Sequence, residues 1–205
     1  YARDMECWNN ILVVSTADSV FYTSNSGASW TPLMNGIGIG NAITQICIYQ
    51  NELYGVLYKG TGESEIHKLT DTSSTWTYSN FQVPWTNSIT DVVATDSAVF
   101  ICSDYSYNIY KSKDNGATWN NAGNNIAFNT TVQTLNGTGN ILYASTNNGI
   151  YMTTDGGALW MPATNGLQGT NSVCFKMLVK GPLLYAAFTD YSSVSKIVIG
   201  SNTWT

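Results

Sequence analysis

Hydrophobic and polar residues alternate along the chain in short runs that predict β-strands throughout. Apolar or β-branched runs are separated by turns rich in Asn, Gly and Asp, as in ILVVST followed by AD and ILYAST followed by NNG. This spacing is typical of strands joined by tight turns. Runs such as ILVV and LLYAAF are apolar at every position, which favours strands covered on both faces. No segment of useful length shows helical periodicity, so the predicted fold class is all-β.

The strand pattern recurs five times. Each copy ends with an apolar strand, a polar turn and a tryptophan, and these tryptophans are Trp30, Trp76, Trp119, Trp160 and Trp204. Their successive separations are 46, 43, 41 and 44 residues. With four strands per copy, such a period is the blade length of a β-propeller. The sequence therefore predicts one five-bladed β-propeller domain over residues 1–205, with four-stranded antiparallel blades at approximately 3–34, 42–79, 88–122, 131–163 and 172–205.

The end of each copy resembles the Asp-box, or bacterial neuraminidase repeat, which is written S-x-D-x-G-x-T-W. Residues 112–119 match this motif at every defined position, and residues 153–160 are close to it. The first copy has Asn25 in place of Asp, the second has Ser73 in place of Gly, and the last keeps little beyond Thr-Trp. The resemblance covers the whole chain in phase. It implies that the box forms the turn between the third and fourth strands of each blade.

A box of this kind is a structural turn. The Asp carboxylate accepts hydrogen bonds from backbone N–H groups just ahead of it, as in an Asx turn. Gly tolerates the positive φ that follows, and Trp packs its ring between blades. We assign structural roles to these box residues and expect the five tryptophans to be largely buried: Asn25, Gly27, Trp30, Asp71, Trp76, Asp114, Gly116, Trp119, Asp155, Gly157, Trp160 and Trp204. In the resembling families the box lies opposite the active site.

The loops on the opposite face hold the candidate ligand-binding residues. With the strands labelled A to D outward, the B–C and D–A loops share this face because four strands alternate in direction. Three of these loops carry aromatic rings, two of them beside a carboxylate: Trp85, Asp104, Tyr105, Tyr107, Asp190 and Tyr191. Rings that stack on sugars beside acids that bind hydroxyls are typical of glycan-binding surfaces. The alternative interpretation is that these rings cover blade edges or simply reflect a Tyr-rich composition.

Composition excludes several classes of function. The net charge is −5, with eight Lys and Arg residues in all, so nucleic-acid binding is not expected. No apolar run approaches the ~20 residues of a membrane-spanning helix. Cofactor-binding glycine motifs are lacking, so no cofactor is predicted. Four cysteines without a CxxC pair, together with a single His67, predict no metal site. These cysteines are either buried free thiols or form one or two disulfides.

Two enzymatic interpretations follow from the resemblance. Asp-box sialidases hold their substrate with three arginines, and this chain has only Arg3, so sialidase activity is excluded. Other Asp-box propellers are glycoside hydrolases with two carboxylates across a cleft. The carboxylates outside the boxes that are candidates for such a pair are Asp18, Glu63, Glu65, Asp91, Asp96, Asp104 and Asp190. No spacing selects a pair among them, so no catalytic residue is assigned.

The favoured hypothesis is a non-catalytic extracellular binding or structural module, secreted or at the cell surface, with glycan, matrix or a partner protein as its ligand. A chain that starts at Tyr1 is expected to be a processed mature form or a fragment. The fifth copy has one residue after its Trp, whereas the others continue into a strand, so the last blade is expected to be incomplete. Its open edge predicts either strand addition from another copy or a portion cut from a longer propeller, and the alternative is a plain three-stranded blade.

Overall fold

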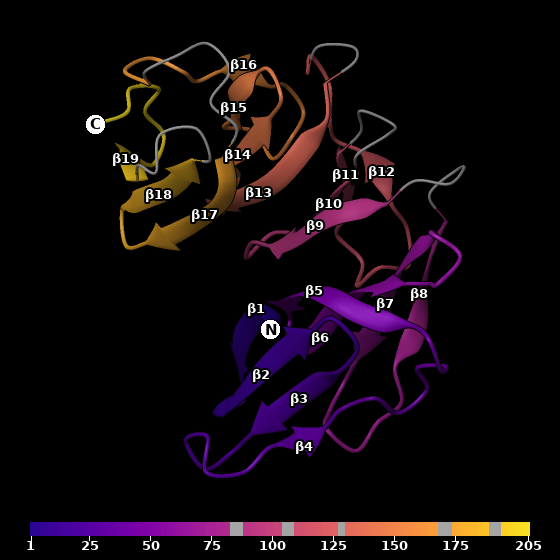
Figure 1. Cartoon of the computed structure of the whole chain (residues 1–205). Helices are drawn as coiled ribbons and strands as arrows, with labels where there is room; N and C mark the ends of the chain where they lie inside the picture. The colour runs from indigo at the N-terminus through magenta and orange to yellow at the C-terminus, as the bar shows by residue number, and fades with distance from the viewer. Residues whose placement is uncertain (83–87, 104–108, 127–129, 168–173, 189–193) are drawn as a thin grey trace.

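The computed structural model describes residues 1–82, 88–103, 109–126, 130–167, 174–188 and 194–205, and every regular element in these ranges is a β-strand. The strands form five separate antiparallel sheets around a common axis (Figure 1). The chain is therefore a five-bladed β-propeller, as the sequence predicts. Within the described ranges no helix is long and apolar enough to cross a lipid bilayer.

The blades are numbered in chain order, and each runs from its inner to its outer strand. Their strands are β1 (Ala2–Trp8), β2 (Ile11–Thr16), β3 (Val20–Thr23) and β4 (Thr31–Pro32); β5 (Ala42–Tyr49), β6 (Glu52–Tyr58), β7 (Ser64–Leu69) and β8 (Thr77–Gln82); β9 (Ile89–Ala94), β10 (Val99–Ser103), β11 (Ile109–Ser112) and β12 (Asn120–Asn121); β13 (Val132–Thr138), β14 (Ile141–Thr146), β15 (Gly149–Thr153) and β16 (Met161–Pro162); and β17 (Cys174–Lys180), β18 (Leu183–Phe188) and β19 (Val194–Val198).

The last blade has three strands, so the prediction that it is incomplete is confirmed. At the place of a fourth strand, Thr205 exchanges two backbone hydrogen bonds of 2.9 Å with Lys196. Thr77 pairs with Lys68 at the equivalent place in blade 2. Because Lys68 and Lys196 pair with the residue that follows a repeat tryptophan, they occupy the same register position in their blades.

Two-residue turns join the first two strands of several blades. Asn9 and Asn10 connect β1 to β2 with φ of 48° and 65°, and Gln50 and Asn51 connect β5 to β6 with φ of 47° and 66°. Positive φ at both central residues is the backbone of the type I′ turn, whose twist matches that of the flanking strands. Asparagine accepts this conformation at low cost, which explains its abundance between the apolar runs.

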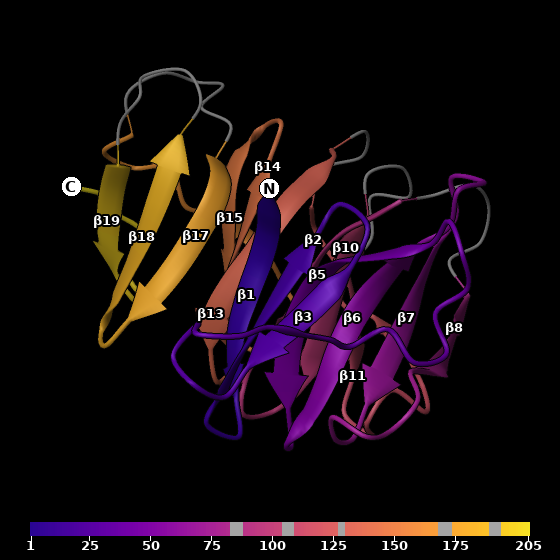
Figure 2. The same cartoon turned by 60° about the horizontal axis from the view of Figure 1, so that its bottom comes forward.

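The hydrophobic core lies between successive sheets. Val13 and Leu33 of blade 1 pack with Ile46 and Leu53 of blade 2, and all four are buried. The same arrangement recurs at the three following blade junctions. Figure 2 shows the inner strands side by side around the axis, with their long directions roughly parallel to it. Each blade therefore has two apolar faces, and each face depends on a neighbouring sheet for its burial.

Four of the repeat tryptophans make one recurring contact with the blade before them. Each indole Nε1–H donates to the backbone carbonyl three residues after the preceding repeat tryptophan: Trp76 to Leu33 at 2.9 Å, Trp119 to Ser79 at 3.4 Å, Trp160 to Ala122 at 2.6 Å and Trp204 to Ala163 at 2.8 Å. Trp76, Trp160 and Trp204 are buried and Trp119 is half-buried. A buried indole needs a partner for its N–H, and a residue in or directly after the outer strand of the preceding blade supplies it.

The expectation that all five repeat tryptophans are buried is wrong for Trp30. This side chain is 44% exposed, and no described residue accepts its indole N–H. The reason is its position in blade 1. The other four tryptophans pack on a preceding blade, whereas no outer strand precedes Trp30 in the described chain.

We expect Trp160→Ala to destabilise the fold by about 3–5 kcal/mol, the range for a fully buried tryptophan replaced by alanine. The lost contacts are the ring packing between blades 3 and 4 and the hydrogen bond to Ala122. Trp30→Ala is the matched control, because it removes the same side chain where no preceding blade packs on it, and it should cost less than about 1 kcal/mol. Urea unfolding of both variants measures the two costs, and equal costs would contradict this packing scheme.

Candidate functional site

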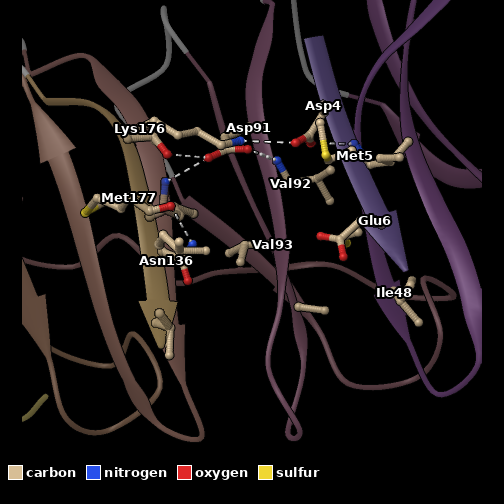
Figure 3. A pocket seen from close by; sticks show the side chains of 17 residues that line it. Asp4, Met5, Glu6, Ile48, Asp91, Val92, Val93, Asn136, Lys176 and Met177 are labelled. Atoms are coloured by element: carbon tan, nitrogen blue, oxygen red, sulfur yellow. Dashed lines mark hydrogen bonds and ion pairs between the residues drawn. The ribbon is translucent and has the colours of Figure 1, made fainter. Parts of the chain in front are cut away.

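The five inner strands enclose a cavity of about 320 Å³ on the axis. Three carboxyl side chains and one ammonium group face it: Asp4 and Glu6 from β1, Asp91 from β9 and Lys176 from β17 (Figure 3). Apolar side chains such as Val93 and Leu178 complete the wall. The cavity is therefore small, and its carboxyl and ammonium groups come from three of the five blades.

An irregularity in each inner strand places these polar groups at one level. The strand register shifts between Ala2 and Asp4, Ile43 and Ile46, Ile89 and Asp91, Val132 and Thr134, and Cys174 and Lys176. Such bulges leave a backbone group of the bulged strand outside the regular ladder. In four blades the side chain that follows the shift is polar and lines the cavity, and we call these four residues the polar ring: Asp4, Asp91, Thr134 and Lys176.

Two carboxylates of this polar ring bind the backbone of the next blade. Asp4 Oδ2 accepts the N–H of Ile46 at 3.1 Å, which joins blade 1 to blade 2. Asp91 Oδ2 accepts the N–H of Leu135 at 3.0 Å and the hydroxyl of Thr134 at 2.6 Å, which joins blade 3 to blade 4. Both backbone N–H groups come from the irregular part of an inner strand. These carboxylates therefore satisfy donors that the strand ladder leaves unpaired.

Lys176 carries the only hydrogen bond or ion pair between blade 5 and blade 1 that the described residues make. Its Nζ lies 3.2 Å from Asp4 Oδ1, and the two residues are the first and last members of the polar ring. The pKa of Lys176 is raised because Asp4, and less strongly Asp91, favour its charged form over the opposing effect of burial. Lys176 is thus held in its charged state.

Glu6 is the third carboxyl group in the cavity and differs from the other two. Burial, and next the charge of Asp4, raise the pKa of Glu6 from its ordinary value of 4.5 to about 7, although Lys176 acts in the opposite direction. No described residue donates a hydrogen bond to it. Burial also raises the pKa of Asp91 to about 6, against the lowering effect of Thr134. Glu6 is therefore the cavity acid that changes protonation near neutral pH while its oxygens stay unpaired.

The predicted ligand-binding residues Trp85, Asp104, Tyr105, Tyr107, Asp190 and Tyr191 lie outside the described residues. The described strand ends next to them lie at the end of the axis where the polar ring also lies, because the strands of each blade alternate in direction. Of the other candidate carboxylates, only Asp91 reaches the cavity. Glu65 pairs with Lys59 and His67, and Asp18 accepts the hydroxyl of Thr16.

The turns before the repeat tryptophans have the hydrogen bonds expected of a structural carboxylate. Asp114 Oδ1 accepts the N–H of Thr118 at 2.9 Å, and Asp155 Oδ1 accepts that of Leu159 at 3.0 Å. Hydrogen bonds from Thr118 lower the pKa of Asp114 to about 2. Asn25 uses its amide oxygen for the same contact, with Ser29 N–H at 3.0 Å. The likeness to the Asp-box stays a prediction. The Asp and Asn side chains bind backbone groups of their own turns, and these turns lie far along the strands from the polar ring.

Residues of metal-binding type do not gather within the described ranges, where no group of three or more His, Cys, Asp or Glu side chains could hold an ion. All four cysteines are free thiols, with Cys7 exposed and the others buried. Cys47 borders the cavity, and burial raises the pKa of its thiol. The expectation of buried free thiols is therefore confirmed for three cysteines and wrong for Cys7, which is free but exposed.

Sequence reasoning missed Asp4 and Glu6. Both lie on β1, where a pattern of charged residues alternating with Met5 and Cys7 could have shown two acids on one face of an inner strand. Asp91 shares this signal because it is a lone carboxylate inside an otherwise apolar strand. An acid at that place in an inner strand points to the axis.

Comparison with known proteins identifies the family. The description "DUF6242 beta propeller domain" matches residues 34–173, which is more than half of the chain. The chain belongs to the DUF6242 beta propeller domain family. No match was found among curated proteins.

Solved structures similar to this DUF6242 domain are propellers of several kinds. A GH74 enzyme from Niastella koreensis has 19% identity and a TM-score of 0.75, covering 100% of this chain and 36% of its own. The extracellular domain of BT4673 from B. thetaiotaomicron has 17% identity and a TM-score of 0.73, with coverages of 96% and 27%. YCF48 bound to D1 peptide has 14% identity and a TM-score of 0.70, with coverages of 100% and 67%. At these identities the likeness shows the fold alone, and the chain spans about a third of the first two structures.

We expect Glu6→Gln to make the stability of this DUF6242 domain less dependent on pH. A folded-state pKa of about 7, above the ordinary 4.5, means that Glu6 favours folding when it is protonated. That contribution is complete below the ordinary pKa and is lost as the pH rises through about 7. The neutral amide should therefore stabilise the fold by about 1–2 kcal/mol at alkaline pH, after allowance for solvent screening, and by little under acidic conditions.

The control for this prediction is Glu63→Gln, since Glu63 is an exposed loop residue outside the cavity. Its unfolding free energy should change little at either pH. Denaturant titrations of the wild type and both variants on each side of neutrality give the comparison. A Glu6→Gln effect that is the same at both pH values would show that ionisation of Glu6 does not oppose folding.

Proposed function

We propose that the chain is a non-catalytic binding module, secreted or displayed at a cell surface, that holds a partner protein or a glycan on its B–C and D–A loop face. The observation that carries the proposal is the use of the cavity carboxylates. Asp4 and Asp91 accept backbone N–H groups of the next blade, so they serve the packing of the inner strands. A glycosidase of the usual kind needs two carboxyl groups free to act on one bond.

The loop face suits a binding role for a different reason. Loops on a rigid scaffold commonly carry recognition residues, and these loops have a sequence rich in aromatic and acidic residues. The proposed ligand contacts are Trp85, Asp104, Tyr105, Tyr107, Asp190 and Tyr191. Fold-level likeness supports the same reading, because the YCF48 propeller is solved with a bound peptide and the BT4673 domain is extracellular.

Glycan arrays and panels of soluble polysaccharides test this function directly. We expect retention of a ligand without chemical change, and Trp85→Ala or Tyr191→Ala should weaken its binding about tenfold, as expected for loss of one stacking contact worth about 1.4 kcal/mol. Tyr78→Ala is the matched control, since Tyr78 is an exposed ring on outer strand β8, away from these loops. Equal losses in all three variants would contradict a binding site on the loop face.

The second candidate function is glycoside hydrolysis, and one observation favours it. Glu6 has a pKa of about 7 and unpaired oxygens, which is the state required of a general acid. Release of reducing ends from a polysaccharide, abolished in Glu6→Gln, would establish this function and overturn the non-catalytic proposal. Unchanged polysaccharide that nevertheless binds to the protein would support the binding module.

A further inference from the structure

The outer strand of blade 2 is longer than those of blades 1, 3 and 4. β8 has six residues, whereas β4, β12 and β16 have two each. It ends the strand order of its sheet, and no described strand pairs with its outer edge. Figure 2 shows β8 at the outer margin of the propeller, with β7 on its inner side. Blade 2 packs against blades 1 and 3 within the chain, so this edge is open although both faces of the blade are covered.

The register shows that backbone groups of Tyr78 point away from the sheet. Thr205 exchanges two backbone hydrogen bonds with Lys196, and Thr77 pairs with Lys68 at the equivalent place, so the backbone groups of Thr77 face β7. Successive residues of a strand direct these groups to opposite edges, and the N–H and C=O of Tyr78 therefore face outward. Outside the sheet ladder, no described residue bonds to either group. The open edge thus offers an unpaired donor and an unpaired acceptor.

Blades 1 and 4 have a proline where blade 2 has Tyr78. Pro32 and Pro162 follow their repeat tryptophans by two residues, and each pairs with the third strand at the same register position as Tyr78. Proline has no N–H and is confined to edge positions where that group would face solvent. Short strands, prolines and charged side chains are common defences of an open edge. β8 has the sequence TYSNFQ and lacks all three, and its register shift lies beyond Tyr78.

The side chains beside this edge favour a particular kind of partner segment. The ring of Tyr78 is 40% exposed, and its centroid lies 5.8 Å from that of the His67 ring. Phe81, farther along β8, is buried in the junction with blade 3 and anchors the strand. An added strand would place side chains next to the Tyr78 ring, where aromatic and β-branched neighbours are favourable. β8 has no charged residue that could pair with a charge on that strand.

We propose that the outer edge of β8 binds an extended segment of a partner protein, which becomes a fifth strand of blade 2. Such a segment supplies main-chain donors and acceptors at the spacing of a β-ladder, so it matches the free groups of Tyr78. The register shift beyond Tyr78 favours a flexible segment over a second propeller, because rigid sheets pair along edges that are regular on both sides. An uncharged segment without proline, with an aromatic or β-branched residue beside Tyr78, fits this edge. The contact uses no loop residue, so it is separate from the proposed ligand face.

Short peptides selected from a random phage-displayed library against the chain are the probe for this edge. Tyr78→Pro should weaken binding of the selected peptides about tenfold or more, because it removes the outward N–H and places a pyrrolidine ring at the edge. Tyr78→Phe keeps the N–H and the aromatic ring, so it should bind like the wild type. Asn121→Pro, at the same register position of blade 3, is the matched control and should not change the binding. The proposal is overturned if every selected peptide binds Tyr78→Pro as tightly as the wild type, or if the selection yields no binder.

Tyr78→Pro is expected to fold, since Pro32 and Pro162 hold this position in blades 1 and 4. Its urea unfolding curve should stay close to that of the wild type. Hydrogen exchange of the wild type tests the same contact without a variant. The Tyr78 amide should exchange rapidly in the free chain and slowly in the complex with a selected peptide. An amide that exchanges at one rate in both states would contradict strand addition at β8.

A second copy of the chain could occupy the same edge by pairing β8 with β8. Sedimentation velocity separates this case from the proposal. We expect the wild type and Tyr78→Pro to show the same state of association in the absence of peptide. Self-association of the wild type that is lost in Tyr78→Pro would assign the edge to a second copy and overturn the proposed partner segment.

Discussion

The hydrogen bond from a repeat tryptophan to the outer strand of the preceding blade is the contact on which this propeller depends. It fixes a two-ring side chain, a tight turn and a neighbouring sheet edge in one place, and it recurs at every internal junction. A single blade cannot bury two apolar faces by itself. Its stability therefore comes from its neighbours, as in repeat proteins whose energetics are sums over adjacent units. The direction is constant, because each blade packs its tryptophan onto the blade before it.

At the axis a second set of contacts runs in the opposite direction along the chain. Here a side chain of one blade binds the backbone of the next, as Asp4 does with Ile46 and Asp91 with Leu135. On the second strand of blade 4, the hydroxyl of Ser145 makes a similar contact with the next blade and donates to the carbonyl of Cys174 at 2.8 Å. Asp4 and Asp91 accept N–H groups that these inner strands leave outside their ladders, so both acids serve the packing of neighbouring blades. Glu6 differs from these two acids, because its carboxyl group accepts no hydrogen bond from a described residue.

The fold could be predicted from the sequence because tryptophan spacing records the blade period directly. The exposure of Trp30 could not be predicted, because its local sequence resembles that of the other four tryptophans and only the preceding sheet differs. The same limit applies to the axis. Asp4 and Glu6 look like residues of an ordinary half-exposed strand, and their importance follows from five inner strands meeting there. A local pattern specifies the element, whereas burial and pKa depend on neighbours brought in from elsewhere in the chain.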